Sequence, residues 1–182
     1  MFPTELPSPV GWESHVFTFP DPVNEVSARL VAAGVVAMAV AALALDQPWV
    51  TVVIAYGFVA RVLAGPRFSP LGQLVTRVVT PRLPVAPRPV PGPPKRFAQG
   101  IGAVLSVAAA VLALGLDRWG AAQVLLGALV VAATLEAAFG LCLGCRMFAV
   151  LMRAGVIPDS VCERCNHLWG AARTGDPGTA PG

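Results

Sequence analysis

Charged side chains are scarce in this sequence, and their scarcity excludes most soluble folds. Only 13% of the 182 residues are charged, whereas 55% are hydrophobic. Soluble globular domains carry about 25% charged residues, so we expect a chain of this composition to lie in a lipid bilayer. The excess positive charge is concentrated in one segment, residues 65–96. It therefore bears on membrane topology and gives no reason to expect a nucleic-acid partner.

Two segments lack charge of one sign. Residues 1–21 contain no Lys or Arg, although a secretory signal begins with basic residues, so we expect a polar tail here and no signal. Residues 65–96 contain six basic residues, no acid, and seven prolines between Pro81 and Pro94. Such a chain is extended and cannot bury a core of its own, apart from a short amphipathic helix expected at 70–79. The positive-inside rule places this loop in the cytoplasm.

Four apolar runs predict an all-α fold with four transmembrane helices, because a span needs about 20 apolar residues. Tight turns at Asp46–Pro48 and Asp117–Arg118 would join these spans into two helical hairpins, 22–64 and 97–152. Asp21–Pro22 is expected to cap the first helix. With the basic loop inside, the N-terminal tail and the C-terminal tail, 153–182, both face the cytoplasm. We therefore expect a multi-pass protein of the inner (plasma) membrane.

The last helix is expected to be unusually long. No proline interrupts the chain from Trp119 to Met152, and a continuous helix of that length would extend about 50 Å. A bilayer core is about 30 Å thick, so the end of this helix would project from the membrane. The first pair of cysteines lies in that projecting part.

Four cysteines follow a C-x2-C-x16-C-x2-C pattern: Cys142, Cys145, Cys162 and Cys165. Four thiolates can bind one Zn²⁺, and His167 could replace one of them. Two C-x-x-C pairs can instead act as dithiols in redox or sulfur-transfer chemistry. In the third interpretation, small cysteines only let helices pack closely, beside Gly140 and Gly144. The c-type haem pattern is missed by one residue, so we do not expect haem.

Four polar residues lie within the expected spans: Arg29, Arg61, Gln99 and Glu136. The helical rise places them about 18 to 26 Å from the outer helix ends, so one polar layer near the cytoplasmic interface could contain them all. We predict that Glu136 pairs with Arg29, although both arginines could instead snorkel to the headgroups. On a continuous helix Glu136 would point about 180° away from Cys145, which makes direct proton transfer between them improbable. A membrane quinone in this layer could accept electrons.

Three motifs carry a resemblance to a known family. Asp21–Pro22 precedes the first span, Arg96-Phe-Ala-Gln99 opens the third, and Gly140-Leu-Cys-Leu-Gly-Cys145 closes the fourth. Over about residues 20–155 the chain resembles the integral-membrane family called domain of unknown function 4395, in its actinobacterial form. The resemblance implies a four-helix membrane protein, often encoded beside or fused to thioredoxin-like or rhodanese-like sulfurtransferase proteins. It implies no established activity.

These observations predict a membrane thiol protein that relays electrons or sulfur to a thioredoxin-like or rhodanese-like partner. Catalysis would rest on Cys142, Cys145, Cys162 and Cys165. The alternative is a non-enzymatic scaffold or small-solute permease, in which the same four cysteines hold a structural zinc ion.

Overall fold

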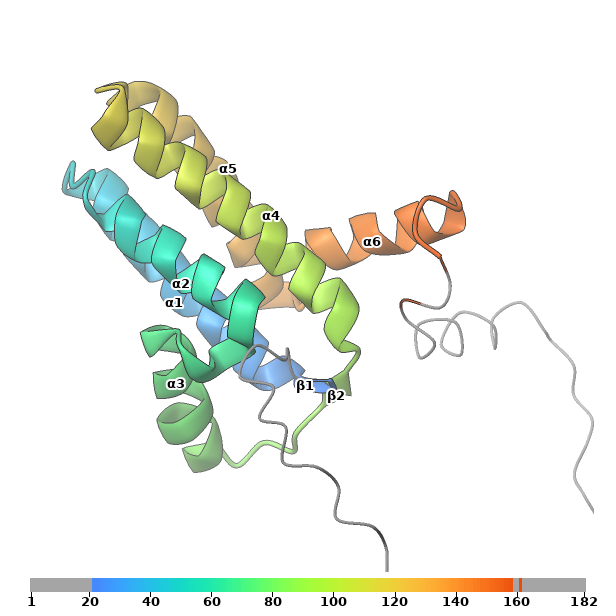
Figure 1. Ribbon diagram of the computed structural model, residues 1–182. Coiled ribbons are helices and arrows are strands. Elements are labelled where there is room, and N and C mark those ends of the chain that lie inside the picture. The colour runs from blue at the N-terminus through green and yellow to red at the C-terminus, as the bar shows by residue number, and fades with distance from the viewer. Residues whose placement is uncertain (1–20, 159–160, 162–182) are drawn as a thin grey trace, which may run out of the picture.

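The fold is known from a computed structural model, which describes residues 21–158 and 161 (Figure 1). Its helices are α1 (Glu25–Ala44), α2 (Val50–Ala64), α3 (Pro70–Leu74), α4 (Gly92–Ala110), α5 (Trp119–Phe139) and α6 (Leu143–Arg153). Four helical segments are long and apolar enough to cross a membrane: Glu25–Ala44, Val50–Arg82, Gly92–Gly115 and Trp119–Phe139. The expected all-α fold with four spans is therefore confirmed.

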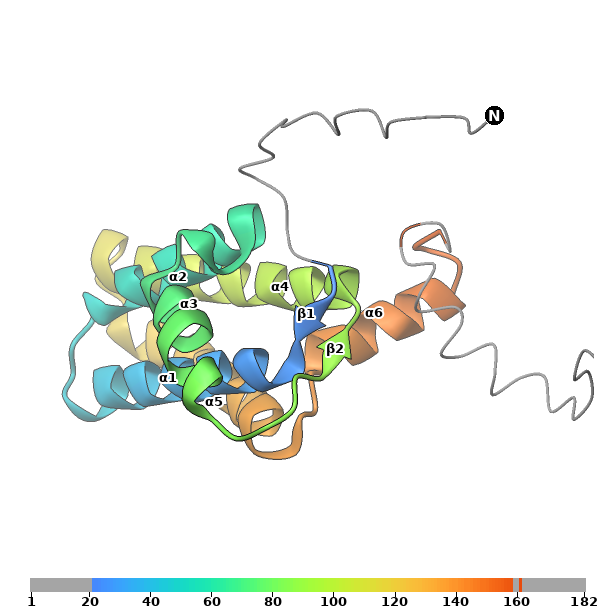
Figure 2. The same ribbon diagram turned by 90° about the horizontal axis from the view of Figure 1, so that it is seen from below.

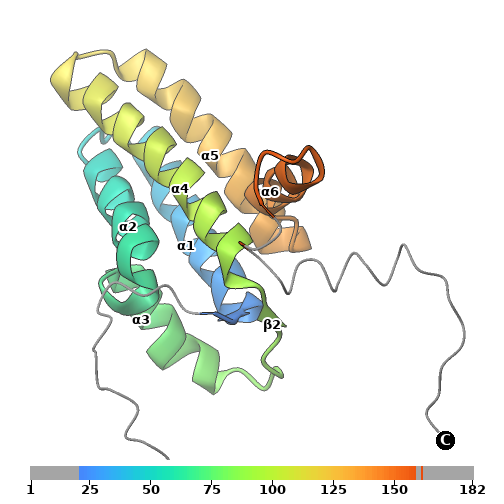
Figure 3. The same ribbon diagram turned by 45° about the vertical axis from the view of Figure 1, so that its right-hand side comes forward.

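The four long helices pack as a bundle in which α1 lies along α5 and α2 lies along α4 (Figure 3). Small residues dominate the interior, including Ala39, Ala42 and Ala109, and small side chains let membrane helices approach closely. Large apolar residues face outward, with Val104 70% and Val124 72% exposed. An outward apolar surface of this kind suits contact with lipid, where a soluble protein would present polar groups.

The two short turns meet at one end of the bundle. Trp119 Nε1 donates a hydrogen bond of 3.1 Å to Asp46 Oδ1, which joins the α4–α5 turn to the α1–α2 turn. The chain from α3 to β2 and helix α6 lie at the opposite end (Figure 1). The basic loop and the first cysteine pair therefore share one end of the molecule.

The first helix begins later than expected. Asp21 does not cap it; instead Asn24 accepts a hydrogen bond from the Val26 amide at 3.0 Å, and α1 starts at Glu25. The preceding β1 (Val23–Asn24) pairs antiparallel with β2 (Pro89–Val90). Asparagine is among the strongest N-caps, which explains why the boundary falls here. The β1–β2 pair holds the end of the proline-rich loop against the start of α1 (Figure 2).

The third span begins earlier than expected. Helix α4 starts at Gly92, not at Phe97, with Pro93 and Pro94 in its first turn. First-turn amide groups have no acceptor within the helix, so proline costs little there. The helix therefore includes Lys95, which was expected to lie in the basic loop.

The loop between the bundle halves is partly helical. The expected short helix at 70–79 is present as α3, which continues through the helical turns Val75–Val79 and Thr80–Arg82. Ser69 caps it by accepting a hydrogen bond from the Gly72 amide. Leu71 contacts α1 at Gly34, where an added Cβ would lie 2.7 Å from Leu71 Cδ1. This loop is therefore tied to the bundle at the end that carries the cysteines.

The expected continuous helix from Trp119 to Met152 is wrong. Helix α5 ends at Phe139, and α6 starts at Leu143 and leaves the direction of α5 to pack against α4 (Figure 2). Gly140 adopts a left-handed conformation with φ +68°, which glycine reaches at no steric cost. The break changes the surroundings of both cysteines.

Candidate functional site

The break between α5 and α6 is a standard glycine C-cap. The Gly140 amide donates to the Glu136 carbonyl at 3.0 Å and the Leu141 amide donates to the Leu135 carbonyl at 3.1 Å. These bonds satisfy carbonyl groups that a helix end would otherwise leave unpaired. Leu141 follows in the connecting segment, and Cys142 is the N-cap residue of α6. The C-x-x-C motif therefore stands at a helix N-terminus, not within a helix interior.

Two of the sequence motifs meet in space at this point. A Cβ added to Gly144 would lie 2.5 Å from the Ala98 Cβ, so α6 and α4 touch where Gly144 has no side chain. One turn further along, the Phe148 ring packs against Phe97 with ring centroids 5.6 Å apart. Together these contacts hold the cysteine pair against the start of α4.

The two thiols of this pair are chemically different. Cys142 is buried, Cys145 is half-buried, and both are free. The Cys145 thiol donates a hydrogen bond to the Cys142 sulfur, which lowers the pKa of Cys142, and the Lys95 ammonium group acts in the same direction. The same hydrogen bond and burial raise the pKa of Cys145. A helix N-terminus also favours a thiolate, so Cys142 is the sulfur that ionises first.

Glu136 pairs with Lys95, and the predicted pair between Glu136 and Arg29 is wrong. Lys95 Nζ lies 2.5 Å from Glu136 Oε1, and both side chains are largely buried. Glu136 faces α4, whereas Arg29 extends from α1 to the end of α5. There Arg29 donates to the carbonyl groups of Ala137 and Ala138 at 2.8 to 3.1 Å. Arg29 thus satisfies the last carbonyls of α5 instead of a carboxylate.

Arg61 and Gln99 are brought together, as the polar layer predicted. Arg61 Nε donates to Gln99 Oε1 at 2.9 Å, and Arg61 Nη1 donates to Ser69 Oγ at 3.0 Å. The guanidinium carbon lies 4.5 Å from the centre of the Phe58 ring. Only 5% of Arg61 is exposed, so this arginine is buried in the bundle and does not snorkel.

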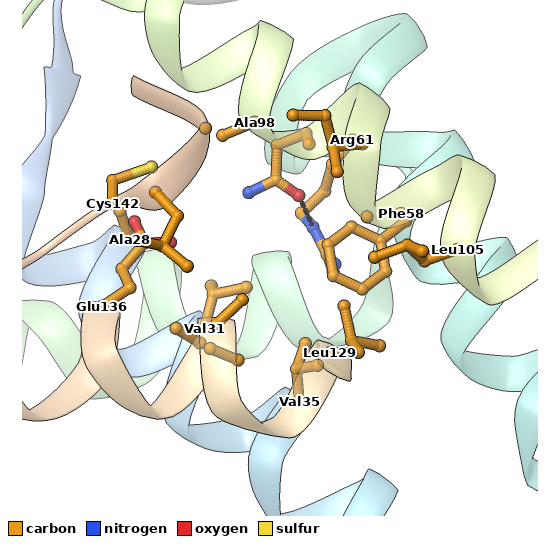
Figure 4. Close-up of a pocket in the computed structure, with 18 residues that line it drawn as sticks. Ala28, Val31, Val35, Phe58, Arg61, Ala98, Leu105, Leu129, Glu136 and Cys142 are labelled. Atoms are coloured by element: carbon orange, nitrogen blue, oxygen red, sulfur yellow. Dashed lines mark hydrogen bonds between the residues drawn. The ribbon is translucent and has the colours of Figure 1, made fainter. Parts of the chain in front are cut away.

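A small cavity lies between these groups. It has a volume of about 70 Å³ and is lined by residues of α1, α2, α4 and α5 together with the start of α6. Figure 4 shows Cys142 and Glu136 on one side of the cavity and Arg61 and Phe58 on the other. A cavity of about 150 Å³ is known to admit benzene. This cavity is smaller, so a quinone ring, which is larger than benzene, would not fit without rearrangement.

The predicted four-cysteine zinc site is left untested, because Cys162 and Cys165, and with them His167, lie outside the described residues. Within residues 21–158 and 161, no three His, Cys, Asp or Glu side chains stand close enough to hold a metal ion. The charged neighbours of the first cysteine pair are Lys95 and Glu136. The described part of the site is therefore a thiol pair beside an ion pair.

Lys95 was missed as a site residue, although the sequence carried a signal for it. Lys95 stands four residues before Gln99 and seven before Gly102, and residues at this spacing share one helix face. The same face of α4 continues inward through Ser106 and Ala109, both fully buried. Because Lys95 lies on the same helix face, this spacing indicates that Lys95 belongs to the helix and faces the bundle.

The fold and the site together define a multi-pass helical protein with a buried polar layer and a C-x-x-C pair at one end. A family model described as Domain of unknown function (DUF4395) matches residues 23–153, and the chain belongs to this family. The match covers both contacting motifs. No curated protein and no solved structure matches the chain.

Proposed function

We propose that this protein is a membrane dithiol that exchanges electrons or sulfur with a thioredoxin-like or rhodanese-like protein through Cys142 and Cys145. One observation supports the proposal above all: the pair stands at a helix N-terminus and consists of one sulfur with a lowered pKa and one with a raised pKa. An unequal pair suits thiol exchange, since one sulfur then leaves readily as a thiolate. Cysteines that served only close packing would not need the neighbouring Lys95.

The proposed location of the pair is the cytoplasmic face of the plasma membrane. Arg67, Arg77, Arg82 and Arg88 belong to the loop at the end of the bundle that carries the cysteines. The turns at the other end contain Asp46 and Asp117. A basic loop on one side favours a cytoplasmic position for that side, and the tails at both ends of the chain would share it.

Thiol exchange would begin at Cys145, because its sulfur is the more accessible of the two. With the pair oxidised, a thiolate of the partner attacks Cys145 Sγ, the Cys142–Cys145 bond breaks, and Cys142 leaves as a thiolate. The partner's second thiol then attacks the partner's own sulfur in the mixed disulfide. Cys145 is released and takes up a proton. The pair has gained two electrons and the partner has become a disulfide.

Sulfur transfer would use the other sulfur of the same pair. The Cys142 thiolate attacks the outer sulfur of a persulfide, a bond forms between those two sulfurs, and the donor cysteine leaves as a thiolate. A low pKa supplies the thiolate that this attack requires. Both forms of the proposal therefore use the same asymmetry between Cys142 and Cys145.

Trapping of the mixed disulfide tests the exchange mechanism. The probe is a thioredoxin whose second active-site cysteine is replaced by serine, mixed with oxidised full-length protein carrying Cys162→Ser and Cys165→Ser. We expect one covalent adduct, mapped by mass spectrometry to Cys145. The Cys142→Ser variant, which cannot form the internal disulfide, is the control and should give no adduct. An adduct at Cys142, or no adduct with the intact pair, would contradict the mechanism.

A further inference from the structure

Arg61 is a buried cation whose hydrogen-bond partners are all neutral. It is 5% exposed and donates to the Gln99 amide oxygen and the Ser69 hydroxyl. Its Nη2 atom is buried and has no hydrogen-bond partner among the described residues. A charge taken out of water without an opposite charge is costly, and more so inside a membrane bundle. The site therefore favours a negative charge close to Arg61.

The ionisable groups around the cavity leave one positive charge uncompensated. Lys95 and Glu136 form an ion pair and cancel each other, so Arg61 remains. Figure 4 shows Glu136 and Arg61 on opposite sides of the cavity. Arg61, Lys95 and Glu136 together carry a net charge of +1.

The cavity between Arg61 and Cys142 has room for a small solute. A volume of about 70 Å³ corresponds to about two waters at the volume that each occupies in the liquid. Beside Arg61, the Gln99 amide nitrogen makes no hydrogen bond to any residue that the structure describes, and Gln99 also lines the cavity. The remaining walls are largely apolar, with Val31, Val35 and Leu129 among them. Such a site offers one charge, one spare amide donor and little space.

We propose that this cavity binds one small inorganic monoanion beside Arg61, with the Gln99 amide nitrogen as a second donor. The site itself rests on the cavity and Arg61, and does not depend on the proposed exchange with a partner protein.

Thermal unfolding of the full-length, detergent-purified protein tests the site, with sodium nitrate as the probe. Sodium gluconate at equal ionic strength is the control salt, because gluconate has the same charge but is too large for the cavity. A bound anion stabilises the folded state in proportion to RT ln(1 + [L]/Kd). We expect the unfolding midpoint to rise with nitrate relative to gluconate, and above the Kd to rise with the logarithm of the nitrate concentration.

Two substitutions at the cavity and one elsewhere decide the outcome. Gln99→Glu places a carboxylate against Arg61 at almost unchanged size, so the nitrate Kd obtained from these curves should rise at least tenfold. Arg61→Gln should do the same if it folds. The matched control is Arg82→Gln, at an exposed arginine of the loop, and should leave nitrate binding as in the wild type. An unchanged nitrate response in Gln99→Glu, or no response in the wild type, would overturn the anion site.

The anion site and the proposed thiol exchange can fail separately. Loss of the mixed disulfide with thioredoxin would count against the proposed function and would not change the nitrate result.

Discussion

Gly144 and Ala98 are in direct contact, so that a Cβ on Gly144 would lie 2.5 Å from the Ala98 Cβ and 2.6 Å from its Cα. This contact joins two motifs that are more than forty residues apart in the sequence. It brings the N-terminus of α6 to the first turns of α4, where Lys95 stands. The position of Cys142 beside the Lys95–Glu136 pair depends on it.

Replacing Gly144 by alanine should displace α6 from α4. The added methyl group meets backbone and Cβ atoms of Ala98, which cannot move aside as a flexible side chain could. Overpacking of this kind costs about 1–3 kcal/mol, and unfolding of the purified protein in detergent would show the loss. The matched control is Gly100→Ala, on α4, where an added Cβ has nothing within 4 Å. Equal stability of the two variants would show that α6 does not pack on α4 as described.

Replacing Gly140 by alanine should weaken the break between α5 and α6. Gly140 has φ +68°, and a left-handed conformation costs an L-residue about 1–2 kcal/mol. The new Cβ would also lie 3.0 Å from Glu25 Oε1. Gly127→Ala, within α5 and free of contacts at that position, is the control. If Gly140→Ala were as stable as Gly127→Ala, the chain would not need a left-handed conformation at residue 140. A continuous helix through this position would then describe the protein better.

The pKa of Cys142 should respond in opposite directions to its two charged neighbours. Lys95 lowers this pKa and Glu136 raises it, so Lys95→Met should shift the pH profile of Cys142 alkylation upward and Glu136→Gln should shift it downward. The rate of iodoacetamide labelling against pH, followed by mass spectrometry, measures both shifts. Shifts of the same sign in the two variants would contradict the arrangement.

Arg29 offers a test of how the polar layer is connected. Because Arg29 bonds the last carbonyls of α5, which are partly buried or exposed, Arg29→Gln should reduce stability by about 1 kcal/mol, the usual net contribution of a hydrogen bond. The alkylation profile of Cys142 should stay as in the wild type, since Glu136 keeps its partner Lys95. A shifted profile in Arg29→Gln would indicate that Glu136 pairs with Arg29 after all, as predicted from the sequence.

Much of the fold was predictable because bilayer thickness and apolar run length together fix the spans. Depth along the helices also placed Arg61 and Gln99 in one polar layer, but it left open whether Arg61 would be buried there or would snorkel to the headgroups. The break at Gly140 did not follow, because glycine inside an apolar run is tolerated in membrane helices and only the capping bonds to Glu136 and Leu135 identify it as an end. Once that break was missed, the orientation of Glu136 toward Cys142 could not be derived.

The partner of Glu136 was missed for a related reason. Pro93 and Pro94 suggested the end of a loop, whereas proline in the first turn is equally suited to opening a helix. Lys95 therefore looked like a topogenic charge outside the membrane. The packing of α4 against α5 buries it instead, with 7% exposed.

The proposed function requires that Cys142 and Cys145 form a disulfide reversibly. The most direct measurement equilibrates anaerobically purified, full-length protein with buffers of reduced and oxidised dithiothreitol, and follows the disulfide state of both cysteines by mass spectrometry together with zinc content. We expect a Cys142–Cys145 disulfide that forms and breaks reversibly, and that is unchanged when Cys162 and Cys165 are replaced by serine. One zinc ion per chain, lost alike in Cys142→Ser and Cys162→Ser, would contradict it and make the cysteines a structural metal site.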